Sequence, residues 1–301
     1  MPELPDVIVY VERLRAYVLG QPLEGATLVS PFVLRSVDPP LDAVVGAPVQ
    51  AVHRLGKRVV FGFPNEHYLV VHLMIAGRLR WRKRNTSPPR GNALAVFHFP
   101  NGTLVFTEAS KRKRASLHVV RGRSHLAGFA RGGLEVLDIT LEEFRDRLIL
   151  QNHTLKRALT DPAILSGIGN AYSDEILFRA RLSPFRQTRH LDEVDMSRLF
   201  DACRETLGEW TERLRSDVGE AFPDKVTAFR PEMAVHGKYR APCPVCGSAI
   251  QRIVYAENEA NYCAKCQAEG RLLADRSLSR LMKKDWPRTL DELERRRDSS
   301  E

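Results

Sequence analysis

The chain has 301 residues, of which 43% are hydrophobic, 28% charged and 8% aromatic. This composition excludes a disordered or collagen-like chain and allows two domains with their own cores. It has no run of about eighteen apolar residues and no basic start with an apolar stretch, so we expect a cytoplasmic protein without membrane contact. The net charge is +9, which predicts a partner of opposite sign.

A helix is expected almost at the N-terminus. Apolar residues recur at helical spacing from Val7 to Val18. Pro5 suits the first turn of a helix, and Gly20 suits its end.

The segment from about Thr27 to Val120 has the pattern of short strands at regular spacing, which predicts a β-sandwich. The expected strands include residues 58–63, 68–73, 93–99 and 103–106, with a tight hairpin turn at Asn101-Gly102.

The charge excess lies within the same segment. Between His67 and Leu134 there are thirteen Lys and Arg residues and one acid, Glu108, so this block carries +12 and the rest of the chain −3. A charge run can be a solvated surface or a disordered arm. Because this one has strand patterns, we expect a polyanion-binding face.

From Thr140 to about Leu214 the pattern is helical, with breaks at 161–162 and 167–170. The glycines of Gly167-Ile168-Gly169-Asn170 allow a tight turn before the next helix. The free N–H groups of that helix start can hold a phosphate, with the Asn170 amide as a further donor. A plain helix-turn-helix corner with Asn170 as N-cap is the alternative. Either interpretation places Asp174 and Glu175 in the first turn.

Four of the five cysteines form two C-x2-C pairs separated by sixteen residues, at Cys243, Cys246, Cys263 and Cys266. Four sulfur ligands leave no open position, which predicts one structural Zn²⁺ on a β-hairpin module. Two disulfides are the alternative, and an intracellular chain would not keep them. The fifth, Cys203, lies in an apolar helical pattern and is expected to be buried.

Several separated motifs together resemble the formamidopyrimidine-DNA glycosylase and endonuclease VIII family over nearly the whole chain. They are Met1-Pro2-Glu3-Leu4-Pro5, Leu55-Gly56-Lys57-Arg58, the turn at 167–170 and the four-cysteine pattern, in the family's order and approximate spacing. The resemblance implies a bifunctional enzyme that excises an oxidised base from DNA and then nicks the abasic site by β,δ-elimination.

The expected fold class is α+β, in four parts. Residues 1–134 form a catalytic β-sandwich domain with a flanking helix, and residues 135–235 a helical helix-two-turn-helix DNA-binding domain. Residues 236–270 form the zinc finger, and residues 271–301 a charged extension expected to be a solvated helix. The implied partner is damaged double-stranded DNA, bound by a monomer associated with the nucleoid.

The resemblance gives catalytic roles to four residues. Once Met1 is removed, the amine of Pro2 attacks the deoxyribose C1′, and an α-amino group with a pKa of about 8 is partly unprotonated near neutrality. Glu3 is the general acid/base. Asp6 stands where the family usually has Glu and ranks below Glu3. Lys57 holds a phosphate beside the lesion.

Four further residues are expected to contact DNA. Asn170 binds a phosphate, and Met74 fills the space left when the target nucleotide rotates out of the duplex, although a Met near a strand can also be core. Arg112, in the basic block, and Lys238, ahead of the first cysteine in the finger segment, complete the set.

Two departures from the family pattern keep alternatives open. The family's Asp-x-Arg-Arg-Phe-Gly stretch is replaced here by residues 107–114, and the finger arginine by Asn258. A member that binds lesions or structured DNA without cutting is therefore the second hypothesis. A zinc-ribbon RNA-binding or ribosome-associated protein, in which Met1 would stay, is the third. Oxidised purines such as 8-oxoguanine and formamidopyrimidines fit the resemblance, while damaged pyrimidines or cross-links remain open.

Overall fold

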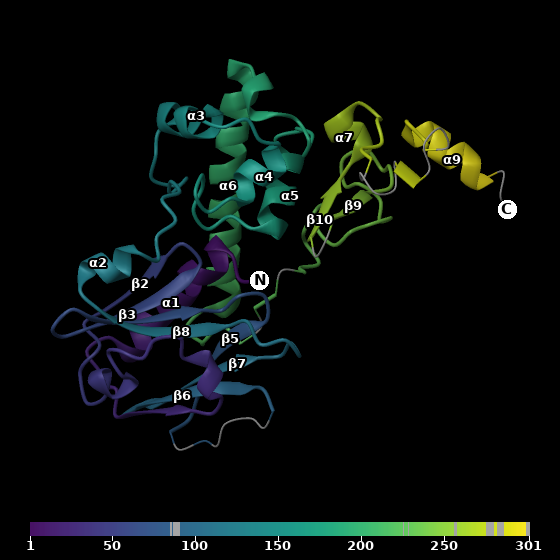
Figure 1. Ribbon diagram of the computed structural model, residues 1–301. Coiled ribbons are helices and arrows are strands. Elements are labelled where there is room, and N and C mark those ends of the chain that lie inside the picture. The colour runs from purple at the N-terminus through teal and green to yellow at the C-terminus, as the bar shows by residue number, and fades with distance from the viewer. Residues whose placement is uncertain are drawn as a thin grey trace. The chain divides into compact units, whose positions relative to one another are not determined.

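The computed structural model describes residues 1–84, 86, 91–224, 226–227, 229–255, 258–274, 280–281 and 286–298 (Figure 1). The chain forms two compact units, the first made of residues 1–132 and 209–228, the second of residues 133–208 and 229–301. In the described ranges no helix is both long enough and apolar enough to cross a membrane.

The first unit begins with the expected helix, α1 (Leu4–Val18). Pro5 lies in its first turn, and Gly20 follows its end with a φ of +78°. The apolar face of α1 joins the core of the unit through Val7 and Leu14, both fully buried. The periodicity of the sequence therefore located this helix correctly.

Two four-stranded antiparallel sheets form the rest of the first unit, in the orders β1-β6-β7-β5 and β2-β3-β4-β8. Apolar side chains of both sheets belong to one core cluster, which confirms the predicted sandwich. The strands are β1 (Gly25–Leu28), β2 (Ala51–Leu55), β3 (Arg58–Phe63), β4 (His67–His72), β5 (Gly77–Arg82), β6 (Ala93–Phe99), β7 (Gly102–Glu108) and β8 (Ser116–Arg121). Short helices occur at η1 (Pro31–Val33), η2 (Leu41–Val44) and α2 (Arg123–Ala127).

The hairpin between β6 and β7 differs by one residue from the prediction. Phe99 pairs with Gly102, so the turn consists of Pro100 and Asn101. A side chain at Gly102 would place its Cβ 2.5 Å from the ring of Trp81. The glycine is therefore required by the close approach of the indole and not by the turn.

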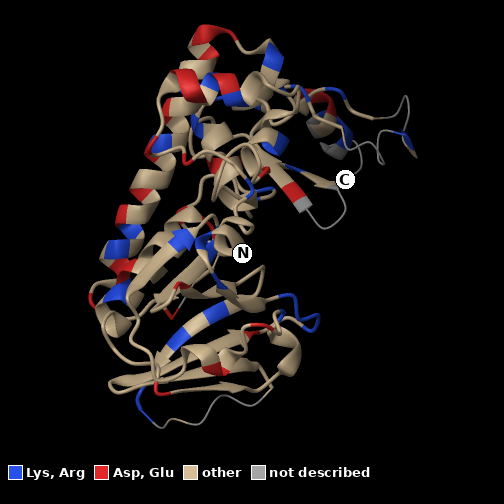
Figure 2. Cartoon of the chain, turned by 60° about the vertical axis from the view of Figure 1, so that its left-hand side comes forward, with Lys and Arg blue, Asp and Glu red and all other residues tan. Residues whose placement is uncertain are grey.

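The second unit contains the predicted helices. They are α3 (Leu141–Ile149), α4 (Leu155–Thr160), α5 (Asn170–Arg179), η3 (Thr188–His190) and α6 (Glu193–Val218), whose last residues belong to the first unit. Thr140 caps α3 by accepting the N–H of Glu143. Cys203 of α6 is buried, as expected. Arginines are interspersed among Asp and Glu residues along α6 (Figure 2).

The turn before α5 corrects two expectations. Gly167 has a φ of +84°, as a tight turn needs. The N-cap is Gly169, so Asn170 is the first helical residue and not the cap. Asp174 and Glu175 accordingly lie beyond the first turn, and both are buried. Their carboxylates therefore do not serve the helix start as first-turn acids.

The zinc module is a hairpin of β9 (Gln251–Tyr255) and β10 (Asn258–Tyr262), followed by α7 (Ala264–Ala268). The extension then packs partly against this module: the Leu273 N–H donates to the Tyr262 hydroxyl at 2.8 Å, and the Leu290 N–H donates to the Gly270 carbonyl at 2.9 Å. Leu290, at the start of α9 (Leu290–Asp298), is buried. The expectation of a wholly solvated helix is wrong at this point, because the apolar start of α9 is covered.

Candidate active site

The N-terminal amine lies in a mostly buried corner of the first unit. Burial lowers the pKa of the Met1 amine below its ordinary value of 8.0. Glu3 and Asp6 act against this shift of the pKa, whereas Arg78 and Lys57 add to it. The structure thus gathers around the amine three of the predicted catalytic residues and one cation, Arg78, that the sequence motifs did not single out.

The two carboxylates of this corner belong to the start of α1. Glu3 and Asp6 are only 2% and 4% exposed. Glu3 is the N-cap residue, and its N–H donates to Asp6 Oδ2 at 2.9 Å. Asp6 therefore fixes the backbone of Glu3 and stabilises the helix start. This contact gives Asp6 a structural use that agrees with its lower rank as a catalytic group.

Lys57 sits in a two-residue turn between β2 and β3. Leu55 pairs with Arg58, and Gly56 supplies the positive φ of +59° that the turn requires. Because a tight turn has few conformations, the side chain of Lys57 starts from a well-defined backbone position. The charge of Lys57 acts on the terminal amine.

Arg78 of β5 is the further cation. Its Nε donates to the Val226 carbonyl at 2.6 Å, and its Nη1 to the carbonyls of Gly77 at 2.7 Å and Ile75 at 3.2 Å. Arginine occupies every second position of β5, so these side chains share one face of the strand. That alternation was the signal in the sequence that could have found Arg78.

Met74 lies in the turn between β4 and β5 and not in the core. It is partly buried and has a φ of +51°, a conformation that costs free energy for a residue other than glycine. The next residue, Ile75, is 54% exposed. Met74 is therefore not among the buried core residues, and the turn exposes the side chain of Ile75.

The basic loop, residues 111–114, is held by one buried acid. The Glu108 carboxylate is 1% exposed and accepts hydrogen bonds from Ser110 Oγ, the Arg114 N–H and the Ala115 N–H, each within 3.2 Å. Arg112, the predicted DNA contact, is exposed. The single acid of the basic block thus shapes the loop that presents its cations.

Asn170 opens α5, a helix of ten residues. The carbonyl of Asn170 accepts a hydrogen bond from Lys156 Nζ at 2.7 Å. The positive end of the helix dipole lies at this position, which suits an anion. Binding of a phosphate by Asn170 remains a prediction.

The four predicted metal ligands form one cluster. All four Sγ atoms lie within 4.8 Å of one another, with Cys246 to Cys263 at 3.4 Å and Cys243 to Cys266 at 3.9 Å. A tetrahedral site with Zn–S bonds of about 2.3 Å places sulfurs about 3.8 Å apart. The cluster therefore fits one structural zinc bound by sulfur alone.

Two arginines near the finger pack over one aromatic ring, an arrangement that no sequence motif indicated. The guanidinium groups of Arg252 and Arg240 lie 4.6 and 5.2 Å from the ring centre of Tyr239. Lys238, a predicted DNA contact, uses its Nζ to bind the Pro231 carbonyl at 2.8 Å. Asn258 opens β10, and its side chain lies outside the described part of the chain.

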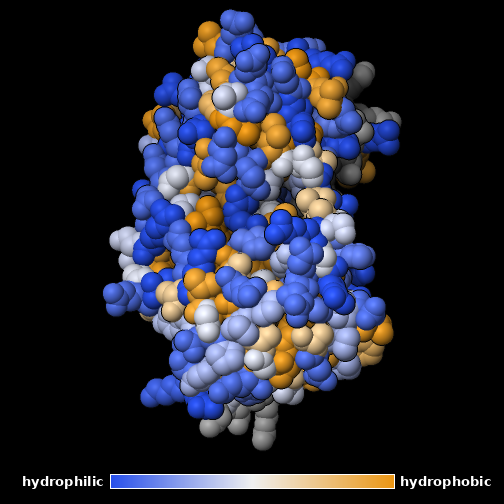
Figure 3. All heavy atoms as spheres, turned by 90° about the vertical axis from the view of Figure 1, so that its left-hand side faces the viewer, coloured by the Kyte–Doolittle hydropathy of each residue, from blue (hydrophilic) through white to orange (hydrophobic). Residues whose placement is uncertain are grey.

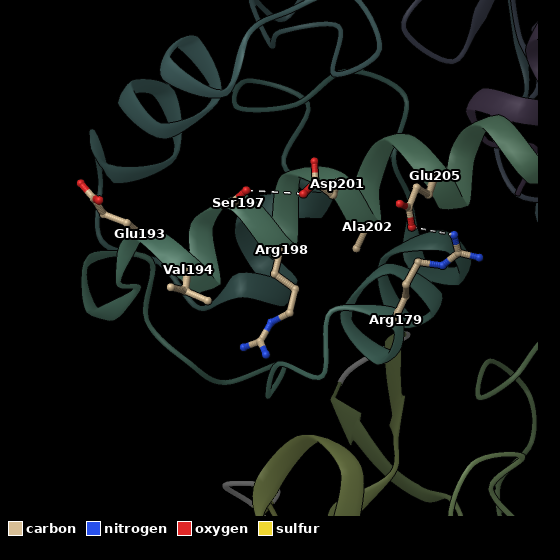
Figure 4. A pocket seen from close by; sticks show the side chains of 8 residues that line it. All are labelled: Arg179, Glu193, Val194, Ser197, Arg198, Asp201, Ala202 and Glu205. Carbon is tan, nitrogen blue, oxygen red and sulfur yellow. Dashed lines mark hydrogen bonds and ion pairs between the residues drawn. The ribbon is translucent and has the colours of Figure 1, made fainter.

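A groove of about 560 Å³ on α5 and α6 carries none of the predicted residues (Figure 4). Its lining includes two arginines and three acids, and Arg179 is bound to Glu205 at 3.1 Å. The slight excess of negative charge does not suit a polyanion.

On the face drawn in Figure 3, hydrophobic residues are interspersed among hydrophilic ones.

Three segments match known domain families. Residues 1–115 match the N-terminal domain of formamidopyrimidine-DNA glycosylase, and residues 135–218 match the H2TH domain of that enzyme. Residues 241–268 match the zinc finger found in FPG and IleRS. The matches follow the order of the predicted parts.

Whole-chain comparisons agree with the domain matches. The formamidopyrimidine-DNA glycosylase of Thermus thermophilus is 33% identical over 90% of this chain and its own full length, and that of an Exiguobacterium species is 30% identical over 89% of this chain. The crystal structure of the MutM (Fpg) protein from Thermus thermophilus superposes with a TM-score of 0.75. A structure of MutM with DNA containing carbocyclic 8-oxo-G gives 0.79 at 25% identity, over 89% of this chain and all of that one.

Proposed function

The chain belongs to the formamidopyrimidine-DNA glycosylase family, and we propose that it excises oxidised bases from DNA through a Schiff base at Pro2 and then nicks the abasic site by β,δ-elimination. Membership makes it a DNA-repair glycosylase that binds DNA and carries a zinc finger. The observation that supports the finer proposal is the corner around the N-terminal amine, where burial and two cations lower the pKa of the amine.

The first step uses the Pro2 amine after removal of Met1. The amine must be unprotonated to attack, and the surroundings that lower the pKa of the Met1 amine would act on the Pro2 amine in the same direction. Attack on C1′ breaks the glycosidic bond, and the base leaves with the bonding electrons and takes up a proton. Glu3, buried beside the amine, protonates the sugar oxygen so that the ring opens and an iminium ion forms.

The second step nicks the strand. The iminium ion withdraws electrons and acidifies the C2′ proton, which a base removes. Elimination of the 3′ phosphate follows, and a second elimination releases the 5′ phosphate. Hydrolysis of the remaining imine by water restores the Pro2 amine. Glu3 shuttles protons in these steps, and Asp6 holds the Glu3 backbone through the N–H contact.

Phosphate contacts would position the DNA on each unit. Lys57 in its turn supplies a cation next to the amine, and Asn170 supplies a helix start. Met74, in the turn between β4 and β5, would enter the space left by the rotated nucleotide. Arg112 in the basic loop and Lys238 beside the finger are proposed as further contacts.

The proposed substrate class is oxidised purines in duplex DNA, such as 8-oxoguanine and formamidopyrimidines. The names of the relatives and the DNA in the MutM complex support this class. The division into residues 1–134, 135–235, 236–270 and 271–301, the monomeric state and a cytoplasmic, nucleoid-associated location stand as proposals with it.

A panel of lesion duplexes tests the proposal. Each lesion is placed opposite all four bases, and strand scission by the wild type is compared with that of Pro2→Gly and Pro5→Ala. Pro5 also lies in the first turn of α1 but carries no amine after processing, so Pro5→Ala should keep the activity. Pro2→Gly, which leaves a primary amine where the ring held a secondary one, should reduce it. Equal cleavage by both variants would contradict a role for the secondary amine of Pro2.

A binding-only member of the family is the second candidate. The basic loop at 111–114 differs from the family's usual stretch, and Asn258 carries no charge where the family has an arginine. This candidate predicts tight binding of abasic-site DNA without scission of any duplex in the panel.

A further inference from the structure

The second unit contains a buried group of polar and charged side chains that meet at Asp174. We call it the Asp174 cluster; its members are Lys156, Asp174, His236 and Asn261, which are 2%, 1%, 4% and 1% exposed. They come from α4, α5, the segment that precedes the first cysteine, and β10. Helix α5 contacts both α4 and β10 (Figure 1). Neither the sequence pattern nor the proposed chemistry assigns a use to this cluster.

On one side the cluster holds the helix start. Lys156 Nζ donates to Asp174 Oδ1 at 2.6 Å and to the carbonyl of Asn170 at 2.7 Å. The ammonium group therefore fixes the backbone carbonyl of Asn170. Asp174 in turn balances the charge of Lys156, which would be costly to bury alone.

On the other side the cluster holds the finger. Asp174 Oδ2 accepts hydrogen bonds from His236 Nδ1 at 2.8 Å and from Asn261 Nδ2 at 3.2 Å. An ionised carboxylate only accepts, so Nδ1 of His236 carries a proton. Asn261 belongs to β10 and stands two residues before the metal ligand Cys263. One carboxylate thus binds the finger hairpin with one oxygen and the Lys156 ammonium with the other.

Residues 234–236, which precede the first cysteine, are held by Glu175, the residue next to Asp174. The Glu175 carboxylate accepts the N–H groups of Ala234, Val235 and His236 at 2.8 to 2.9 Å. His236 is therefore held by its backbone through Glu175 and by its ring through Asp174. Adjacent residues of α5 in this way attach the segment at two points.

The orientation of Asn261 indicates that the contact is kept at some cost. Its Nδ2 also donates to Glu259 Oε1 at 3.1 Å. Because both neighbours are carboxylates, the amide nitrogen must face them, and within the described residues no group donates to the buried Oδ1. An apolar side chain would avoid this cost.

From these contacts we propose that Asp174 is a positioning residue that couples the zinc hairpin to the helix start at Asn170, so that the two DNA contacts of the second unit are held in one geometry. The inference rests on the proposed contact of Asn170 with a DNA phosphate. The coupling itself is a property of the protein and can be measured without DNA.

The test uses Asn261→Ala, which removes the finger's contact without leaving a buried charge, and Asp174→Asn. Asp146→Asn is the matched control, because Asp146 is an exposed acid on α3. Zinc content and thermal stability are measured first, and Asn261→Ala carries the test if Asp174→Asn does not fold. The first readout is hydrogen exchange of the α5 amides. Coupling predicts exchange at least about fivefold faster in the cluster variants and unchanged exchange in the control. Unchanged exchange in zinc-loaded Asn261→Ala would overturn the proposal.

The second readout is a double-mutant cycle with Asn170→Ala on a duplex that carries a tetrahydrofuran abasic-site analogue. We expect Asn261→Ala to weaken binding roughly tenfold in the wild type but less than about twofold when Asn170 is already Ala, because its effect passes through that residue. A merely structural role would give equal losses of affinity in both backgrounds, and that result would overturn the proposal. If the wild type fails to bind the duplex, the proposed function is wrong, and the exchange result alone decides the coupling.

Discussion

Two helix starts of this protein carry buried carboxylates and nearby cations, yet they are built for different purposes. At α1, Asp6 caps the Glu3 backbone, and the terminal amine beside them has a lowered pKa. At α5, Asp174 is bound by Lys156, His236 and Asn261. The first arrangement disfavours the protonated form of the terminal amine, whereas the second pairs the buried carboxylate of Asp174 with a buried ammonium group and two further donors.

We expect the two helix starts to affect different quantities, the reaction rate of bound DNA and the affinity for DNA. Changes at the α1 corner should slow the reaction of bound DNA and leave affinity almost unchanged. Changes at the Asp174 cluster should weaken binding and leave the rate on bound DNA almost unchanged. Single-turnover rates at saturating enzyme, measured beside binding constants, separate the two effects.

The largest effect is expected from blocking the amine. If Met1 is retained or acetylated, the Pro2 nitrogen becomes part of a peptide bond and cannot attack C1′. We expect excision to fall roughly 10⁴-fold or more, as when a nucleophile is removed, while affinity for abasic-site DNA stays within about twofold. Mass spectrometry of the N-terminus establishes the blocked state. Normal excision by the blocked protein would disprove the assignment.

A smaller reduction is expected for Glu3→Gln. The amide keeps the shape of the side chain but cannot transfer a proton, so the single-turnover rate should fall by roughly 10²–10⁴-fold. Glu12→Gln on the same helix is the control, since Glu12 pairs with Arg215 at the surface. Equal effects of the two substitutions would show that Glu3 serves only the helix start.

The dependence of the reaction rate on pH tests the same terminal amine. In the proposed reaction only the unprotonated amine attacks. The rate should therefore stay constant as the pH falls from 8 toward the lowered pKa, and below that pKa it should decline about tenfold per pH unit. The charge of Lys57 lowers this pKa, so Lys57→Gln should raise it and move the decline to higher pH. Arg213→Gln, on the surface of α6, should leave the profile in place. If the decline in rate moved to lower pH in Lys57→Gln, the predicted direction of the pKa change would be wrong.

The smallest effect, a change in the salt dependence of DNA binding, is expected from substitutions in the basic loop. Replacing Lys111 and Arg112 by Gln should reduce the slope of log K against log salt by about 0.9 for each phosphate that the variant no longer neutralises. Cluster variants such as Asn261→Ala should keep the full slope, because the cluster is buried and makes no ionic contact with DNA. Titration of affinity between low and moderate salt distinguishes the two classes of variant.

Much of this architecture follows from local patterns in the sequence. The period of apolar residues located α1, strand patterns located the sandwich, and cysteine spacing located the metal cluster. Each of these features depends on residues close together in the chain. The catalytic assignments of Pro2 and Glu3 came from the family resemblance, and the structure adds their surroundings.

The parts that escaped prediction depend on contacts between distant segments. Asp174 was expected near a helix start by its position alone, but its partners His236 and Asn261 lie 62 and 87 positions away. Gly102 was assigned to a turn, although the ring of Trp81 is what excludes a side chain there. No local pattern contains such contacts, because only the folded chain brings these residues together.

Trapping of the covalent intermediate tests the central claim most directly. The protein is mixed with abasic-site DNA and borohydride, the reduced adduct is digested, and the modified residue is identified by mass spectrometry. The proposed chemistry predicts a processed N-terminus with the deoxyribose fragment attached to Pro2. An adduct on a lysine such as Lys57, or no adduct despite tight binding, would contradict it.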